Sequence, residues 1–397
     1  MERPWRALLL GRATAFTQLV QTQLMFRLLC FLTLGLALAQ SGCRKVSSSS
    51  RERVPSRSQA EPVTTEVSGN ARLRVFSTEA KTALVVMTST DPTVRAHAWA
   101  RLRTTEEYRR LSEREKSFHR SISDTAFYQW LTADSTVARA PALQRTLNAW
   151  MASDIAGAVK RSAAYLPRGT PIRAALYFMI KPHPNTFVYD TERNPTIFVS
   201  VDSTVDAAQF ENEIAHELHH IGYAAACPTP PATGPQTPMD TVVNWMSAFG
   251  EGWAMLAAAG GPNVNPHWES DSADRARWDH DYAHVGDGMK QLNDFFDSVL
   301  TRRISAPDSV QAHAMSFFGV QGPWYTVGYL MARTVEVRDG REKLISVMCS
   351  PPKLLLSYQE AAQDANRAGA HLPLWSEKFV GQLRRYVQDA ASEEVKH

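Results

Sequence analysis

The segment His216-Glu217-Leu218-His219-His220 contains imidazoles and a carboxylate at the spacing that many metal-dependent hydrolases use. On an α-helix, residues four positions apart lie one turn apart on the same face, so His216 and His220 can bind one metal ion. Glu217 lies about 100° further round the helix, where its carboxylate can take a proton from a metal-bound water. The segment therefore predicts one Zn²⁺ per chain, held by His216 and His220, with Glu217 as the catalytic base.

A catalytic zinc usually has three protein ligands, and the sequence Gly250-Glu251-Gly252 offers the third. Apolar residues recur around it at helical spacing, so Glu251 is expected on the opposite face of a second amphipathic helix. Each glycine within a helix costs about 1 kcal/mol relative to alanine. We hypothesise that close packing of two helices beside the metal offsets this cost. We expect Glu251 to be a ligand; an exposed surface glutamate is the alternative.

The helix that carries the two histidines has a recognisable start and an apolar face. Ser203, with Asp206 three residues later, is typical of a capping box that opens a helix. The apolar residues that follow lie roughly opposite the two histidines: Phe210, Ile214, Leu218 and Ile221. One side of this helix is therefore expected to face the core and the other the metal.

Four further polar residues are weaker candidates for the same site. Glu213 precedes His216 by one turn and could orient a ligand histidine, and His219 could orient a ligand or the substrate. Tyr325 and Tyr329 could each supply a phenol that stabilises an oxyanion. For His219 and both tyrosines, a structural role in the core is the more frequent one.

The two segments together resemble a known class of enzymes. Residues 213–220, followed by Gly250-Glu251-Gly252-Trp253-Ala254, resemble the gluzincin class of zinc metallopeptidases, in which two histidines of H-E-x-x-H and a later glutamate hold zinc. More narrowly, they are similar to bacterial zinc-dependent peptidase families of unknown function. The resemblance covers residues 203–260. One position departs from thermolysin-like members, which carry an Asp one turn after the glutamate ligand; here Met255 stands there, so the histidines' supporting partner must come from elsewhere.

The remaining sequence predicts a mainly α (α+β) protein, a zincin-like helical body with a small β-sheet beside the H-E-x-x-H helix. Helical spacing covers residues 72–88, 94–116, 123–131 and 141–166, and strands are expected at 174–180 and 195–201 around a loop at 181–185. Further helices are expected at 273–304, 309–318, 325–337, 341–347, 353–367 and 374–391. We treat 71–397 as one domain with an N-terminal helical part (71–170), a metal-site core (171–260) and a C-terminal helical part (261–397).

The N-terminal sequence predicts export. An apolar run at 28–39 follows Arg27 and ends in Ala37-Leu38-Ala39, so residues 1–39 form the expected signal peptide, with Met25 as an alternative start. Residues 40–70 are expected to be a disordered tether. Cys43 offers a lipidation site, and the exported chain is then periplasmic or held at the cell envelope. If Cys43 is lipidated, Cys227 and Cys349 remain as a candidate disulfide pair; two buried thiols are the alternative.

Charge excludes one class of partner. The chain has 43 basic and 40 acidic residues; residues 1–39 contain four Arg and one Glu, which leaves 39 of each and no net charge. No basic stripe is present for nucleic acid. We therefore expect a peptide or protein substrate and a zinc-dependent hydrolase, specifically a metallopeptidase. The alternatives are a di-iron or di-manganese carboxylate bundle, because Glu213-x-x-His216 and Glu217-x-x-His220 are both E-x-x-H, and a non-catalytic, surface-anchored metal-binding protein.

Overall fold

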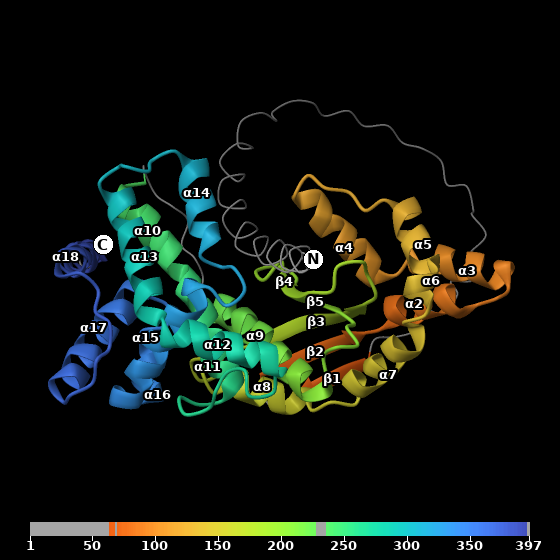
Figure 1. Ribbon diagram of the computed structural model, residues 1–397, viewed down its shortest axis with the longest axis horizontal. Helices are drawn as coiled ribbons and strands as arrows, with labels where there is room; N and C mark the ends of the chain where they lie inside the picture. Colours follow the sequence, from red (N-terminus) through yellow and green to blue (C-terminus); the bar gives the residue numbers. More distant parts are fainter. Residues whose placement is uncertain (1–62, 68–69, 228–235, 395–397) are drawn as a thin grey trace, which may run out of the picture.

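A computed structural model describes residues 63–67, 70–227 and 236–394 of the chain (Figure 1). The expected signal peptide, its alternative start at Met25 and the lipidation site at Cys43 lie outside the described residues. The first half of the described chain contains the sheet and the helices around it, and the second half is helical (Figure 1). The fold is therefore mainly α with some β, as expected. No helix within the described ranges has the length and apolar character needed to span a membrane.

A mixed five-stranded sheet forms beside the H-E-x-x-H helix, in the order β1-β2-β3-β5-β4. The three central strands are parallel, and the two edge strands run antiparallel to their neighbours. Strand β3 is an almost uninterrupted apolar run that is buried on both faces, as is typical of a parallel strand covered by helices. The strands are β1 (Val63–Val67), β2 (Ala71–Phe76), β3 (Ile172–Met179), β4 (Thr186–Tyr189) and β5 (Thr196–Ser200).

Helices surround the sheet and form the rest of the molecule (Figure 1). In the N-terminal half they are α2 (Thr78–Thr88), α3 (Pro92–Leu102), α4 (Glu106–Ser117), α5 (Asp124–Thr132), α6 (Asp134–Val137), α7 (Ala140–Met151) and α8 (Ile155–Ala163). The middle of the chain contains α9 (Ala207–Ala226), α10 (Pro238–Met246), the 3-10 turn η1 (Ser247–Phe249) and α11 (Gly250–Ala259). The C-terminal helices are α12 (Ser272–Ala283), α13 (Val285–Leu300), α14 (Pro307–Ser316), α15 (Pro323–Asp339), α16 (Arg341–Ser346), α17 (Pro351–Arg367) and α18 (Glu377–Glu394).

Helix α9 connects the two halves, because it packs against β3 on one side and α11 on another. Its predicted apolar stripe is fully buried: Phe210, Ile214, Leu218 and Ile221. Phe210 stacks on Trp150 of α7 with ring centroids 4.6 Å apart, and Phe178 of β3 completes this aromatic cluster. The face of α9 opposite the metal ligands is therefore fixed to the sheet.

Three local predictions differ from the structure. Residues 72–76, predicted as the start of a helix, belong to β2, in which Leu73 and Val75 are buried on alternate positions. Residues 63–67 form β1 rather than part of the tether, because the backbone of β2 offers them an antiparallel partner. The third difference is β4, a short strand that follows the 181–185 loop and pairs with β5. In addition, three long predicted helices are each divided in two: 94–116, 141–166 and 273–304.

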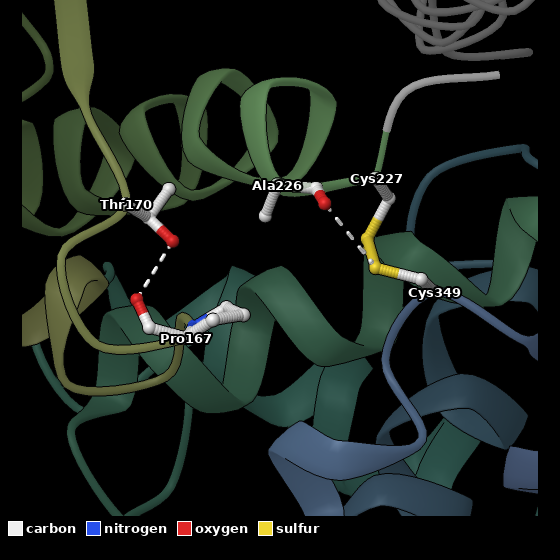
Figure 2. The surroundings of a disulfide bond; sticks show 5 residues. All are labelled: Pro167, Thr170, Ala226, Cys227 and Cys349. Carbon is white, nitrogen blue, oxygen red and sulfur yellow. Dashed lines mark hydrogen bonds between the residues drawn. A yellow bond between two sulfur atoms is a disulfide. The ribbon is translucent and has the colours of Figure 1, made fainter.

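A disulfide bond joins the C-terminal end of α9 to the segment before α17. Cys227 and Cys349 are bonded across 122 positions of sequence, with their Cα atoms 5.1 Å apart (Figure 2). The Cys349 Sγ atom also lies 3.6 Å from the carbonyl oxygen of Ala226. The candidate pair of cysteines therefore does form a disulfide, and it fastens the ligand-bearing helix to the C-terminal helices.

Candidate metal centre

His216 and His220 lie one turn apart on α9 and their rings meet edge to face. Their centroids are 4.7 Å apart and their Nε2 atoms 3.0 Å apart. Helix α9 begins at Ala207, because the Asp206 carboxylate caps it by accepting a hydrogen bond from the Gln209 backbone. The predicted cap, Ser203, lies three positions too early, whereas the helix itself and the face that carries the two histidines are as expected.

Glu251 reaches the same point from α11. Its Oε2 atom lies 3.2 Å from the Nε2 atom of His216 and 3.2 Å from that of His220. In a tetrahedral zinc site with bonds of about 2.0–2.1 Å, ligand atoms lie roughly 3.3 Å apart. The three atoms thus form a triangle of nearly the size that zinc requires, and their nitrogen and oxygen donors suit this metal. All three side chains are mostly buried.

The charges of these side chains depend on one another. Burial alone would raise the pKa of Glu251, but His220 and His216 outweigh burial and hold this pKa at about 2. Burial lowers the pKa of His216. For His220, burial acts in the same direction, but the Glu251 carboxylate outweighs it and the pKa is raised. Two imidazole nitrogens and a carboxylate that stays ionised together form a donor set that a divalent cation can bind.

Glu217 differs from Glu251 in its surroundings. Burial raises its pKa to about 8, and the charge of Glu251 adds to the increase, whereas His220 opposes it. Its Oε2 atom is buried and has no hydrogen-bond partner within the described part of the chain. A buried carboxyl oxygen beside two metal ligands, with no partner of its own, is suited to bind and deprotonate a water.

Two glycines bring α11 and α15 together. A Cβ atom on Gly252 would lie 1.9 Å from the Tyr329 nitrogen and 2.4 Å from the Tyr325 carbonyl oxygen, and one on Gly328 would lie 2.5 Å from the Phe249 carbonyl oxygen. The hypothesis of close packing beside the metal therefore holds for Gly252, whose partner is α15. It is wrong for Gly250, where an added Cβ would meet no atom within 4 Å.

This helix crossing separates the two candidate tyrosines. Tyr325 lies in the metal centre: its buried ring is nearly parallel to that of His216, with centroids 6.4 Å apart, and burial together with the charge of the nearby Glu251 carboxylate raises the pKa of its hydroxyl. Tyr329, one turn later, donates instead to the Val264 carbonyl oxygen at 3.2 Å and packs on Trp278. Only Tyr325 therefore reaches the residues that could hold a metal.

The other two candidates lie outside the ligand set. His219 is completely buried and stacks on Trp253, and burial lowers its pKa to about 3, so this imidazole is neutral. Glu213 points towards the edge strand, where Thr186 donates to its carboxylate at 3.4 Å. Both side chains therefore have other neighbours, and the orienting roles predicted for them stay predictions.

One residue near the site carries no signal in the sequence. His267 lies in the loop between α11 and α12, which Asn212 of α9 holds by donating to the Pro266 carbonyl oxygen at 2.9 Å. Burial lowers the pKa of His267 to about 4; Asp274 opposes this, and the nearby His216 adds to it. A lone histidine in a Pro- and Asn-containing loop has no spacing that connects it to H-E-x-x-H, so only the fold reveals the proximity.

Comparison with known proteins gives one match. The model of a family described as "Putative zinc dependent peptidase" matches residues 99–367. This range contains every residue of the candidate metal centre and about two thirds of the chain. No curated protein matches the chain, and no solved structure matches it.

Proposed function

Because this chain belongs to the zinc-dependent peptidase family whose model covers most of its length, we propose that it is an exported metallopeptidase with Glu217 as general base. The observation that carries the proposal is the triangle of His216 Nε2, His220 Nε2 and Glu251 Oε2, with sides of 3.0–3.2 Å. Within the described ranges, these residues are the sole group of three metal-binding side chains found close enough together. The proposed cofactor is one Zn²⁺ per chain.

The chemistry follows from the positions of these side chains. His216, His220 and Glu251 would hold the zinc ion, which would supply a Lewis acid that lowers the pKa of water at the site towards about 7. Glu217 accepts a proton from the attacking water and then delivers it to the leaving amine nitrogen. Removal of such a base typically slows turnover by about 10²–10⁴-fold.

The substrate is proposed to be an extended peptide that pairs with strand β4. This strand lies at the edge of the sheet and pairs with β5 on one side. It also lies beside α9, since Thr186 of β4 donates to Glu213, one turn before His216. An extended peptide can add to such an edge through backbone hydrogen bonds, which would place a peptide bond near the metal.

Export is proposed from the targeting sequence and from the disulfide. Cys227 and Cys349 are bonded, and structural disulfides persist mainly in oxidising compartments. The intact mass of the mature protein tests this proposal. Cleavage after Ala39, or lipid attached to Cys43, supports it; a mature chain that retains residues 1–39 contradicts it.

The peptidase proposal is tested with Glu217→Gln. We expect this variant to bind one zinc per chain and to lose nearly all cleavage of a peptide library, while wild-type cleavage stops when a chelator removes the metal. Glu211→Gln on the same helix is the matched control, because Glu211 instead accepts from the Asp154 backbone. The mechanism is refuted if Glu217→Gln cleaves as fast as wild type. The di-iron alternative needs a second group of metal-binding side chains, and none is found in the part of the chain that the structure describes, where Glu213 accepts from Thr186.

A further inference from the structure

Tyr325 lies against the glutamate that is proposed to bind zinc. It occupies the first turn of α15, its side chain is buried, and burial together with the negative charge of the nearby Glu251 carboxylate raises the pKa of its hydroxyl. The Tyr325 ring also covers His216, with a centroid distance of 6.4 Å and an interplanar angle of 24°. One side chain therefore lies beside two of the three proposed ligands.

The fold fixes this tyrosine through the backbone. The crossing of α11 and α15 is so close that a Cβ atom on Gly252 would lie 2.4 Å from the Tyr325 carbonyl oxygen. Gly252 directly follows Glu251, so the main chains that carry Glu251 and Tyr325 are in contact. Helices α11 and α15 therefore cannot slide past each other without a backbone clash. Their packing fixes the distance between the Glu251 carboxylate and the Tyr325 hydroxyl.

The carboxylate of Glu251 needs such a partner. Its Oε2 atom faces both histidine nitrogens, and a carboxylate binds a metal with a defined orientation only if its remaining hydrogen-bonding capacity is also satisfied. The residue one turn later, Met255, has no hydrogen-bond donor to offer. A donor must therefore come from another element, and Tyr325 of α15 lies where it can supply one.

We propose that Tyr325 is a positioning residue, whose hydroxyl donates to Glu251 and holds this carboxylate with Oε2 towards His216 and His220. This inference rests on the proposed function in one respect, namely that zinc is the metal held there. It differs from a role at an oxyanion, because the single phenolic proton is donated to the ligand rather than to the substrate.

Tyr325→Phe tests the proposal by removing the hydroxyl while the ring stays. Tyr329→Phe is the matched control: it lies one turn later on the same helix, and its hydroxyl donates to the Val264 carbonyl oxygen. Zinc affinity is measured by competition with a chromophoric chelator. We expect Tyr325→Phe to bind zinc about 10- to 100-fold more weakly than wild type, and Tyr329→Phe to bind within about twofold of wild type.

The proposal is overturned if Tyr325→Phe binds zinc as tightly as wild type, or if both variants weaken zinc binding equally. Urea unfolding of each zinc-free variant identifies a general loss of structure, which we do not expect from either hydroxyl. Zinc affinity is measured without a peptide. A protein that binds zinc with the predicted difference but cleaves no peptide would therefore refute the peptidase and leave the role of Tyr325 supported.

Discussion

At the scale of single residues, the histidine partners of Glu251 separate the pKa values of two equally buried carboxyl groups in the metal centre. Glu251 lies between two histidine nitrogens and has a pKa of about 2, because these partners outweigh its burial. Glu217 is as deeply buried but lacks such a pair, and burial raises its pKa to about 8. Two carboxyl groups whose pKa values are pushed apart are suited to different tasks: Glu251 to hold a cation, and Glu217 to exchange a proton.

His219 makes stability dependent on pH. Burial lowers its pKa to about 3 from an ordinary value of 6.5. Between these values the unfolded chain binds a proton that the folded protein does not, so the free energy of unfolding rises as pH increases from about 3 to 6.5. Lowering the pH from 7 to 4.5 should therefore cost on the order of 2–3 kcal/mol through this residue alone.

The measurement is urea unfolding of zinc-free wild type and His219→Leu at both pH values. When the pH falls from 7 to 4.5, we expect the free energy of unfolding to decrease by about 2–3 kcal/mol less in His219→Leu than in wild type. His280→Leu is the control, since the His280 side chain is 71% exposed. Equal acid sensitivity in wild type and His219→Leu would contradict the assignment of a buried neutral imidazole.

At the scale of the elements, the two glycines beside Glu251 have different roles. Gly252 allows α11 to touch α15, where a Cβ atom would lie 1.9 Å from a backbone nitrogen. We expect Gly252→Ala to destabilise the fold by about 1–3 kcal/mol or more and to weaken zinc binding. Gly250 is helical and has no neighbour within 4 Å of an added Cβ, so Gly250→Ala should gain up to about 1 kcal/mol.

Urea unfolding of the two variants distinguishes these effects. The described helix crossing is supported if Gly252→Ala lowers the free energy of unfolding and Gly250→Ala raises it. Equal destabilisation would mean that both glycines are tightly packed, and no destabilisation by Gly252→Ala would mean that α11 and α15 are further apart.

The sequence predicts an element when its signal is local. The apolar stripe of α9 and the spacing of His216 and His220 are local, and both are found as expected. The start of α2 depends instead on Glu107 of α4, which accepts hydrogen bonds from the backbone of Thr78 and Glu79. The residues before it pair with β3 and form a strand. Helical spacing within 72–88 cannot reveal either long-range partner.

The candidate site shows the same distinction between residues with a local signal in the sequence and residues placed by long-range packing. Glu251 could be proposed because flanking glycines and an apolar face isolate a carboxylate on a helix. Tyr325 and Tyr329 are equivalent in the sequence, since both lie on one helix at successive turns. Only the crossing at Gly252 and Gly328 decides that Tyr325 meets Glu251 and that Tyr329 faces Val264.

At the scale of the whole molecule, the Cys227–Cys349 disulfide closes a loop across 122 positions of sequence. A crosslink of this span restricts the unfolded chain, and its loss typically costs about 2–5 kcal/mol. We expect the double variant Cys227→Ser, Cys349→Ser to be destabilised by this amount. Reductant should destabilise wild type similarly and leave the double variant unchanged. A wild-type protein whose urea midpoint does not respond to complete reduction would contradict this prediction.

Metal analysis of the purified protein tests the central claim, that side chains of α9 and α11 hold a single zinc ion. The account predicts one zinc per chain in wild type and in Glu217→Gln. It predicts a large loss of zinc affinity in His216→Ala, His220→Ala and Glu251→Ala, each compared with wild type at equal zinc activity. Two iron ions per chain, or full zinc affinity in Glu251→Ala, would contradict it.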